Sequence, residues 1–239
     1  ASLPSPPAAF KRVMSSTRTV QNQNMASDSA AIRVLATQQI NAQSGELAAL
    51  DALPWAKVEA EQIQAAFAPQ PIDVLLNNAA TDEALFSEDT RQANILHIAA
   101  HNIYDPTEPD VVGLALNQAS ANGTGGTLID IRAIEHSGFA NNLVFLNACD
   151  TANGRDFDGV GSLSLARAFL QSGAQTVVAT KWPIVDRASG MFAAHFYRAI
   201  QSGSNAEQAL NLAIAGMQSS RRYKHPYYWA GYELTQRHL

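Results

Sequence analysis

The chain has 239 residues, of which 46% are hydrophobic and 15% are charged, and its formal net charge at pH 7 is −5. A chain of this length can bury one good core as a single domain. Lysine and arginine are scattered along it, so the sequence carries no electrostatic footprint for nucleic acid or for an anionic membrane surface. A transmembrane helix of roughly 20 apolar residues and a signal peptide are also missing from the pattern, and we expect a cytoplasmic domain.

The first 30 residues are rich in Pro, Ser, Thr, Gln and Asn and contain few large apolar residues. Such a segment cannot offset by burial the conformational entropy that it would lose on ordering. We therefore expect a flexible linker or a loosely docked arm over residues 1–30, followed by one folded domain over residues 31–239.

Short apolar runs alternate with amphipathic segments in the first half of that domain. The sequence predicts strands near Ile32–Thr37 and over "IDVLLNN" and "NILHIAA", and a helix over "TDEALFSEDTRQ" capped by Thr81 or Asp82. A further amphipathic helix is predicted from Pro54 to just before Pro69. Its apolar face is expected to contain Trp55, Val58, Ile63 and Phe67, and the remaining faces to contain most of Lys57, Glu59, Glu61 and Gln64.

The second half continues the same alternation after a long middle segment. That segment is expected to hold a loop, a short extended pair around "VVGLAL" and a helix beginning at Asp130. The sequence then predicts a buried strand over "NLVFLNA", a helix closed by Gly173, a buried strand over "AQTVVAT", a helix that Asp186 could cap, and a helix with a capping box from Ser204 to Glu207. Alternating strands and helices are typical of an α/β fold with a mostly parallel central sheet.

Two of the predicted strands end in reactive residue types. "ILHIAAHN" contains His101, and "LVFLNACD" contains Cys149, the single cysteine of the chain, which excludes an internal disulfide. Groups just past the carboxyl ends of strands share one crevice in an open α/β sheet, so a cysteine nucleophile and its base could meet there. The separation of 48 residues fits the caspase pattern, in which the histidine lies about 50 residues before the cysteine. The alternative is a small buried core thiol.

Other chemistries are poorly supported by the sequence. His97 alternates with Ile98 inside a predicted buried strand, which indicates an interior histidine with a hydrogen-bond partner. In "HIAAH" the position after the first histidine is Ile98, where the zinc-peptidase motif needs glutamate. No Gly-Lys-Ser/Thr or G-x-S-x-G motif occurs. We expect no metal and no cofactor.

Three blocks of the sequence together resemble a known family. They are "ILHIAAHN", "LVFLNACDTANGRDFDGVGSLSLARAFLQSGAQTVVATKWPIVD" and "HPYYWAGYEL", and they are similar to the CHAT domain, a caspase-like and separase-like domain of the clan CD cysteine peptidases. The resemblance covers about Ile32 to Gln236. It implies a caspase-like three-layer fold with a mostly parallel central sheet flanked by helices, a catalytic dyad of His101 and Cys149, a protein or peptide substrate, and a tetratricopeptide-repeat or other regulatory region in the parent protein.

The resemblance also implies where a substrate oxyanion would bind. The backbone N–H groups of Cys149 and of the residue after His101 would hold it. The family usually has glycine after the histidine, whereas this chain has Asn102. Asparagine is the next most tolerant residue of left-handed backbone angles, so the turn can survive, but its side chain can narrow the site or shift that N–H group.

The segment "TKWPIVD" corresponds to one that borders the substrate groove in related folds. Trp182 and Pro183 would form a rigid apolar wall, and Asp186 would be either an acid for a basic substrate side chain or a helix cap. Asp150 would either belong to the groove or orient the nucleophile loop through local hydrogen bonds. By contrast, Tyr227, Tyr228 and Trp229 are expected to be core aromatic residues rather than a ligand cage.

Two functions from different classes follow. The first is a cysteine endopeptidase domain controlled by a larger protein or complex. The second is a catalytically weak interaction or scaffold module that keeps the caspase-like fold, an alternative that Asn102 favours. A small-molecule thiol hydrolase or transferase using the same dyad is a third option.

Overall fold

The structure of the protein is a computed structural model that describes residues 32–42, 46–104, 112–119, 125–150 and 160–237. The arm predicted over residues 1–30 lies outside the described residues. Within the described part, an eight-stranded sheet forms the centre of the molecule. Its strands are β1 (Ile32–Ala36), β2 (Asp73–Leu76), β3 (Ile95–Tyr104), β4 (Val112–Asn117), β5 (Gly126–Asp130), β6 (Leu143–Asp150), β7 (Thr176–Thr180) and β8 (Tyr232–Gln236).

The main path of the sheet runs in the order β2-β1-β3-β6-β7-β8. Its first five strands are parallel, and β8 closes one edge antiparallel to β7. Strand β3 is longer than predicted and changes its neighbour on one side. It pairs with β1 as far as Ala99 and with the antiparallel strand β4 from His101 onward.

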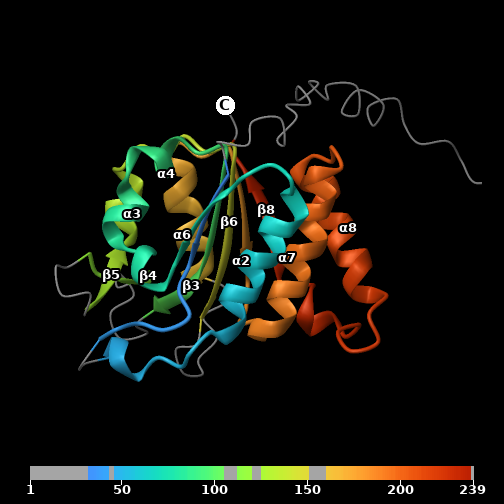
Figure 1. The fold of residues 1–239 in the computed structure, drawn as a ribbon, viewed down its shortest axis with the longest axis horizontal. Helices are drawn as coiled ribbons and strands as arrows, with labels where there is room; N and C mark the ends of the chain where they lie inside the picture. The colour runs from blue at the N-terminus through green and yellow to red at the C-terminus, as the bar shows by residue number, and fades with distance from the viewer. Residues whose placement is uncertain (1–31, 43–45, 105–111, 120–124, 151–159, 238–239) are drawn as a thin grey trace, which may run out of the picture.

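Helices cover both faces of the sheet, as Figure 1 shows. The helices are α2 (Pro54–Phe67), α3 (Asp82–Phe86), α4 (Glu88–Gln92), α5 (Ile131–Glu135), α6 (Val160–Ser172), α7 (Asp186–Gln201) and α8 (Ala206–Gln218), with 3-10 turns η2 (Glu46–Ala49), η3 (Asn77–Ala79) and η4 (Pro226–Tyr228). One layer holds α2, α7 and α8, and the opposite layer holds α3, α4 and α6. The predicted three-layer α/β class with a mostly parallel sheet is confirmed.

Two separate cores follow from the alternation of side chains along the buried strands. In β3 and β6 the odd-numbered apolar residues pack toward α2 and α7, and the even-numbered ones toward α6. Phe145 is central to the first core, because its ring lies 5.0 Å from that of Phe196 and 5.2 Å from that of His97. The odd positions of both strands therefore share the α2 and α7 layer.

Several local predictions need correction. "TDEALFSEDTRQ" forms two short helices, because Ser87 is extended and its hydroxyl caps α4 after Thr81 has capped α3. The capping box before α8 lies one residue later than predicted and uses Asn205 and Gln208.

The three aromatic residues near the C-terminus were expected in the core, and they lie at its margin. Tyr227 is 44% exposed, whereas Tyr228 and Trp229 pack partly buried against the core. The side chain that enters the core from this region is Tyr232 of β8, whose ring stacks on Phe192 at 3.6 Å.

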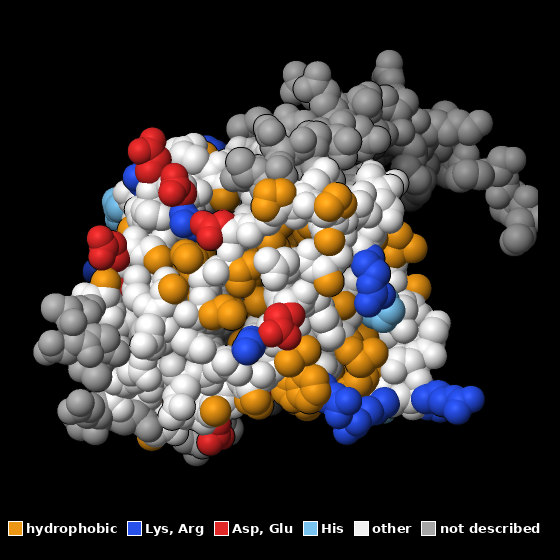
Figure 2. All heavy atoms as spheres, in the orientation of Figure 1, with side chains coloured by type: hydrophobic (Ala, Val, Ile, Leu, Met, Phe, Trp, Pro, Cys, Tyr) orange, Lys and Arg blue, Asp and Glu red, His pale blue; other side chains and the backbone are white. Residues whose placement is uncertain are grey.

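Charges are unevenly distributed on the face drawn in Figure 2, although acidic and basic side chains also lie next to each other there. Acidic side chains gather at the edge formed by α3 and α4, whose first turns carry two acidic residues each, and basic side chains gather at the opposite lower edge. Acidic residues suit a helix N-terminus because its unpaired N–H groups are partly positive. Among the described helices, none is long and apolar enough to cross a bilayer.

Truncating Phe145 should destabilise the domain strongly. Its side chain is fully buried among four other rings, so Phe145→Ala should lower the free energy of unfolding by about 3–5 kcal/mol in a urea titration. Leu212→Ala, at a position that is 54% exposed, is the matched control and should change it by less than about 0.5 kcal/mol. Equal losses for the two variants would contradict this assignment of the core.

Candidate active site

The two residues predicted as a dyad lie side by side on neighbouring strands. In the parallel pairing of β3 with β6, His101 is in register with Cys149, and Asn102 with Asp150. Strands paired in a sheet lie about 4.8 Å apart, so the two backbones are adjacent. The side chains of Cys149 and Asp150 lie outside the described part of the structure, and their predicted roles stay predictions.

His101 is held by a loop that precedes α2. The imidazole is 2% exposed, and its Nε2 lies 2.7 Å from the backbone carbonyl oxygen of Asp51. A carbonyl oxygen only accepts, so Nε2 must donate, and in the neutral ring the proton-accepting nitrogen is then Nδ1. Sequence reasoning missed Asp51, because its contribution comes from the main chain and leaves no residue-type signal.

Burial lowers the pKa of His101 below its ordinary value, and the hydrogen bond to the Asp51 carbonyl and the charge of Asp51 oppose that shift. Desolvation disfavours the charged imidazolium, and here it is the largest cause. The ring is therefore neutral at pH 7. A neutral imidazole with an oriented N–H is the form that a general base requires.

Asn102, the residue after His101, has an unusual environment. It is 1% exposed, and neither atom of its amide has a hydrogen-bond partner in the described structure. Its backbone is paired on both sides, with Leu114 of β4 and with Asp150 of β6. Its N–H group thus points toward a paired neighbour strand, a setting that the sequence did not indicate.

The other predicted groove residues lie after β7. Trp182 is half-buried, and its indole Nε1 donates a 2.9 Å hydrogen bond to the carbonyl oxygen of Tyr227, while Pro183 is exposed. The indole also packs so closely on Gly231 that an added Cβ there would lie 2.8 Å from the ring. Trp182 is thereby fixed to the C-terminal segment of the chain.

Asp186 is a helix cap, but it caps a different helix from the one expected. It is the first residue of α7, and its Oδ2 accepts a 2.8 Å hydrogen bond from the backbone N–H of Trp55 at the start of α2. Burial raises the pKa of Asp186, the Trp55 hydrogen bond opposes this, and the nearby charge of Glu59 adds to the rise. Arg187 extends the same contact, since its guanidinium lies 4.6 Å from the centre of the Trp55 ring.

A buried polar network lies just below the dyad on the same layer. Glu59 of α2 is 1% exposed, although the sequence placed it largely outside the apolar face. Asn147 donates from Nδ2 to both of its carboxylate oxygens at 2.7 and 2.6 Å, and His97 Nε2 lies 3.0 Å from Oε1. His97 Nδ1 lies 3.0 Å from the Tyr197 hydroxyl, so the prediction of an interior, hydrogen-bonded His97 is confirmed.

The spacing of apolar residues in the sequence could have predicted that Glu59 is buried. The buried residues of α2 are Ala56, Glu59, Ala60, Ile63 and Phe67, and Glu59 lies three and four residues from two of them, which is the spacing of one helix face. Asn147 carried a weaker signal, as a polar residue inside an otherwise apolar run. The two histidines of "HIAAH" lie on β3, where four residues span about 13 Å, so they do not share one ligand position.

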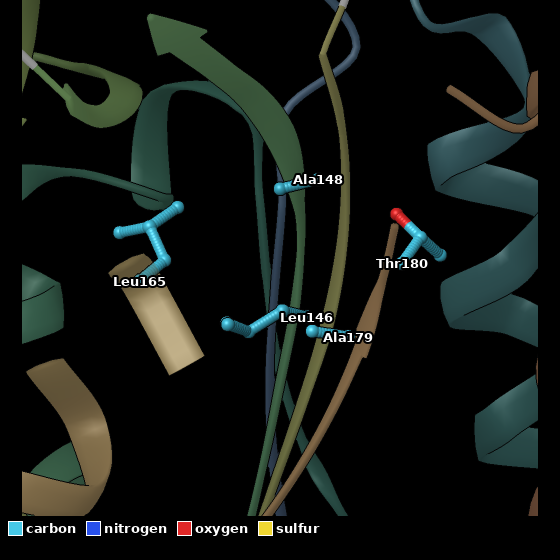
Figure 3. Close-up of a pocket in the computed structure, with 5 residues that line it drawn as sticks. All are labelled: Leu146, Ala148, Leu165, Ala179 and Thr180. Carbon is cyan, nitrogen blue, oxygen red and sulfur yellow. The ribbon is translucent and has the colours of Figure 1, made fainter. Parts of the chain in front are cut away.

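A shallow hollow lies beside the end of β6 and is drawn in Figure 3. It is lined by Leu146, Ala148, Leu165, Ala179 and Thr180. The side chains of Leu146 and Ala148 point toward the α6 side of the sheet, opposite to the layer that contains His97 and Glu59. With a nearly apolar lining, this hollow offers no reactive group.

A family model described as the CHAT domain matches residues 7–237 of the chain. The chain belongs to the CHAT domain family. The family resemblance that the sequence blocks predicted is thus confirmed, and it covers nearly the whole chain.

Relatives of this CHAT domain include two much longer proteins. The chain is 38% identical over 111 residues to tetratricopeptide repeat protein 28 of Mus musculus and 41% identical over 93 residues to that of Homo sapiens, which is 46% and 38% of this chain. It spans about 4% of the length of either relative. Among solved structures, the Arg-specific cysteine proteinase gingipain R superposes with a TM-score of 0.49 at 7% identity, over 92% of this chain and 48% of that one.

The cap that Asp186 provides can be measured. In the CHAT domain Asp186→Ala should leave the Trp55 N–H without its acceptor and lower the free energy of unfolding by about 0.5–2 kcal/mol. Asp186→Asn keeps an oxygen acceptor and should lose clearly less in the same urea titration. Equal losses for the two variants would show that the hydrogen bond does not stabilise α2.

Proposed function

We propose that this CHAT domain is a cysteine endopeptidase that cleaves a protein substrate through His101 and Cys149. The observation that carries the proposal is the register of the two residues at the carboxyl ends of adjacent parallel strands. It is supported by the neutral, buried His101 ring, whose Nε2 is occupied by the Asp51 carbonyl. This orientation assigns proton transfer to Nδ1.

The reaction would proceed in two stages. Nδ1 of His101 takes the thiol proton of Cys149, and the sulfur attacks the carbonyl carbon of the scissile peptide. The oxyanion is held by the backbone N–H groups of Cys149 and Asn102. The imidazolium returns its proton to the departing amine, and water then hydrolyses the thioester.

The remaining groove residues take roles around that centre. Trp182 and Pro183 form an apolar wall, and Asp150 orients the nucleophile loop. Asp186 already caps α2, which favours a cap over an acid for a basic substrate side chain. A tetratricopeptide-repeat region of the parent protein would regulate the domain, and the names of the two relatives support the presence of such a region.

The alternative function is an interaction module with little catalysis, and the pairing of Asn102 favours it. An oxyanion needs a peptide N–H that is free of the sheet, and Asn102 is paired on both sides. Peptidase activity therefore requires the end of β3 to separate from a neighbour, which a regulatory partner can supply. The two functions make different predictions. If the domain is a peptidase, His101 makes Cys149 reactive under some condition, whereas in an interaction module it does so under none.

Alkylation of the single cysteine tests the dyad directly. Iodoacetamide should label Cys149 about 10²–10⁴ times faster in the wild type than in His101→Ala, which is the usual range for a lost general base. Mass spectrometry gives the rates, and cleavage of a diverse peptide library by the parent protein gives the activity. The control is His136→Ala, at an exposed helix cap. Equal rates in wild type and His101→Ala, with no peptide cleaved, would support the interaction module.

The pH dependence follows from the lowered pKa of His101. Neutral imidazole is the active base, and burial keeps it neutral to a lower pH than usual, so the alkylation rate should fall on acidification with a midpoint below 6.5, the ordinary value for histidine. The His101→Ala variant should lack this step. A midpoint above 6.5 would contradict a buried, neutral His101 acting as the base.

A further inference from the structure

The carboxylate of Glu59 is the point where the two strands of the candidate dyad are tied to one helix. Through Asn147 it contacts β6 two residues before Cys149, and through His97 it contacts β3 four residues before His101. These contacts lie on the layer of α2 and α7, to which the odd-numbered positions of both strands belong.

The protonation state of Tyr197 determines the direction of the hydrogen bond between Tyr197 and His97. Burial raises the pKa of Tyr197 well above its usual range, and the charge of Glu59 raises it further. The phenol therefore stays protonated and can donate to Nδ1 of His97, 3.0 Å away. In the neutral His97 ring the proton then resides on Nε2, which lies 3.0 Å from Oε1 of Glu59 but is not aligned for a hydrogen bond with it.

Glu59 lies on the helix that directly follows the loop in contact with His101. The Asp51 carbonyl that holds Nε2 of His101 comes three residues before α2 begins at Pro54. Helix α2 is fixed at its N-terminus by Asp186, which binds the N–H group of Trp55, and about one turn later by Glu59. Any shift of α2 relative to the sheet would therefore move the Asp51 carbonyl away from the imidazole.

We infer that Glu59 is a positioning residue of the dyad, acting on Cys149 through Asn147 and on His101 through α2 and the Asp51 carbonyl. The inference rests on the proposed function for its kinetic consequence. It does not make Glu59 a catalytic residue, because the carboxylate is buried and is occupied by Asn147 and His97. Its effect is geometric, and misplacement of reacting groups by about 1 Å can cost 10²-fold in rate.

The test uses isosteric changes in the full 239-residue chain. Glu59→Gln removes one acceptor and sets an amide N–H against the Nδ2 donor of Asn147, so alkylation of Cys149 by iodoacetamide should slow by about 10- to 100-fold. The double change Glu59→Gln with Asn147→Asp exchanges donor and acceptor, and it should recover most of the rate. Glu61→Gln, on an exposed position of the same helix beside Lys57, is the matched control and should react like the wild type.

A spectroscopic readout separates positioning from stability. Long-range ¹H–¹⁵N spectra of the histidine rings should show His101 protonated on Nε2 in the wild type, and Glu59→Gln should shift or broaden this signal. A folded Glu59→Gln variant with wild-type alkylation and an unchanged His101 signal would overturn the inference, even if its melting temperature fell. If Glu59→Gln does not fold, Asn147→Ala gives the same test from the β6 side.

The two proposals fail in different ways. If His101→Ala alkylates as fast as the wild type, the proposed dyad is wrong. The His101 spectrum of Glu59→Gln then still decides the positioning role, because the link from Glu59 through α2 to the Asp51 carbonyl does not involve the thiol. A changed spectrum supports that role, and an unchanged one overturns it.

Discussion

The pairing of β3 with β6 is the constraint on which the site depends. The two strands stay in parallel register over eight residue pairs, from Ile95 opposite Leu143 to Asn102 opposite Asp150. Each pair fixes the next, because a slip by one residue would move every side chain to the other face of the sheet. The apolar residues of both strands pack in two separate cores, so such a slip would bury the wrong set of side chains on both sides. The juxtaposition of His101 and Cys149 thus depends on the packing of residues that have no chemical role.

The buried carboxylate of Glu59 also constrains β3 and β6, through polar contacts. Removing a charge from water is costly unless hydrogen bonds replace the lost hydration. Here an asparagine side chain supplies donors to both oxygens, and a histidine ring lies at hydrogen-bond distance. Since Glu59 and its two partners come from three different elements, only one arrangement of α2, β3 and β6 satisfies the group. An apolar residue at position 59 would pack in many orientations, whereas the carboxylate selects one.

Much of the fold could be predicted from the sequence, because local patterns determine it. The continuous apolar run of β6, the helix that begins at Pro54 and the left-handed Gly173 after α6 were all recognisable from residue types at short range. Local patterns gave a wrong prediction where a signal for a continuous helix competed with a signal for a new helix cap. A single helix was predicted over residues 81–92, but Ser87 is a better cap for a new helix than an interior residue of an old one.

Only part of the candidate site could be predicted from the sequence. The rest depends on tertiary contacts. His101 and Cys149 have reactive side chains at strand ends, so residue type and spacing indicated them. Asp51 contributes a main-chain carbonyl, which every residue has, and no sequence pattern distinguishes it. The cap that Asp186 gives to α2 joins residues 131 positions apart, and only the packing of α7 against α2 makes it possible.

The position of the site follows from the crossover connections on either side of β3, which lie on opposite faces of the sheet. After β1 the chain crosses to β2 through α2 on one face, and after β6 it crosses to β7 through α6 on the other face. Crossovers that leave to opposite faces open a crevice at the carboxyl ends of the strands between them, where ligands bind in open α/β sheets. In this chain β4 lies beside β3 from His101 onward, so the segment that would line the crevice is paired as a strand. The buried amide of Asn102, without a hydrogen-bond partner in the described structure, costs about 1–3 kcal/mol in that arrangement. Separating the end of β3 from β4 would let this amide gain partners, which would offset part of the cost of the ladder hydrogen bonds that are lost.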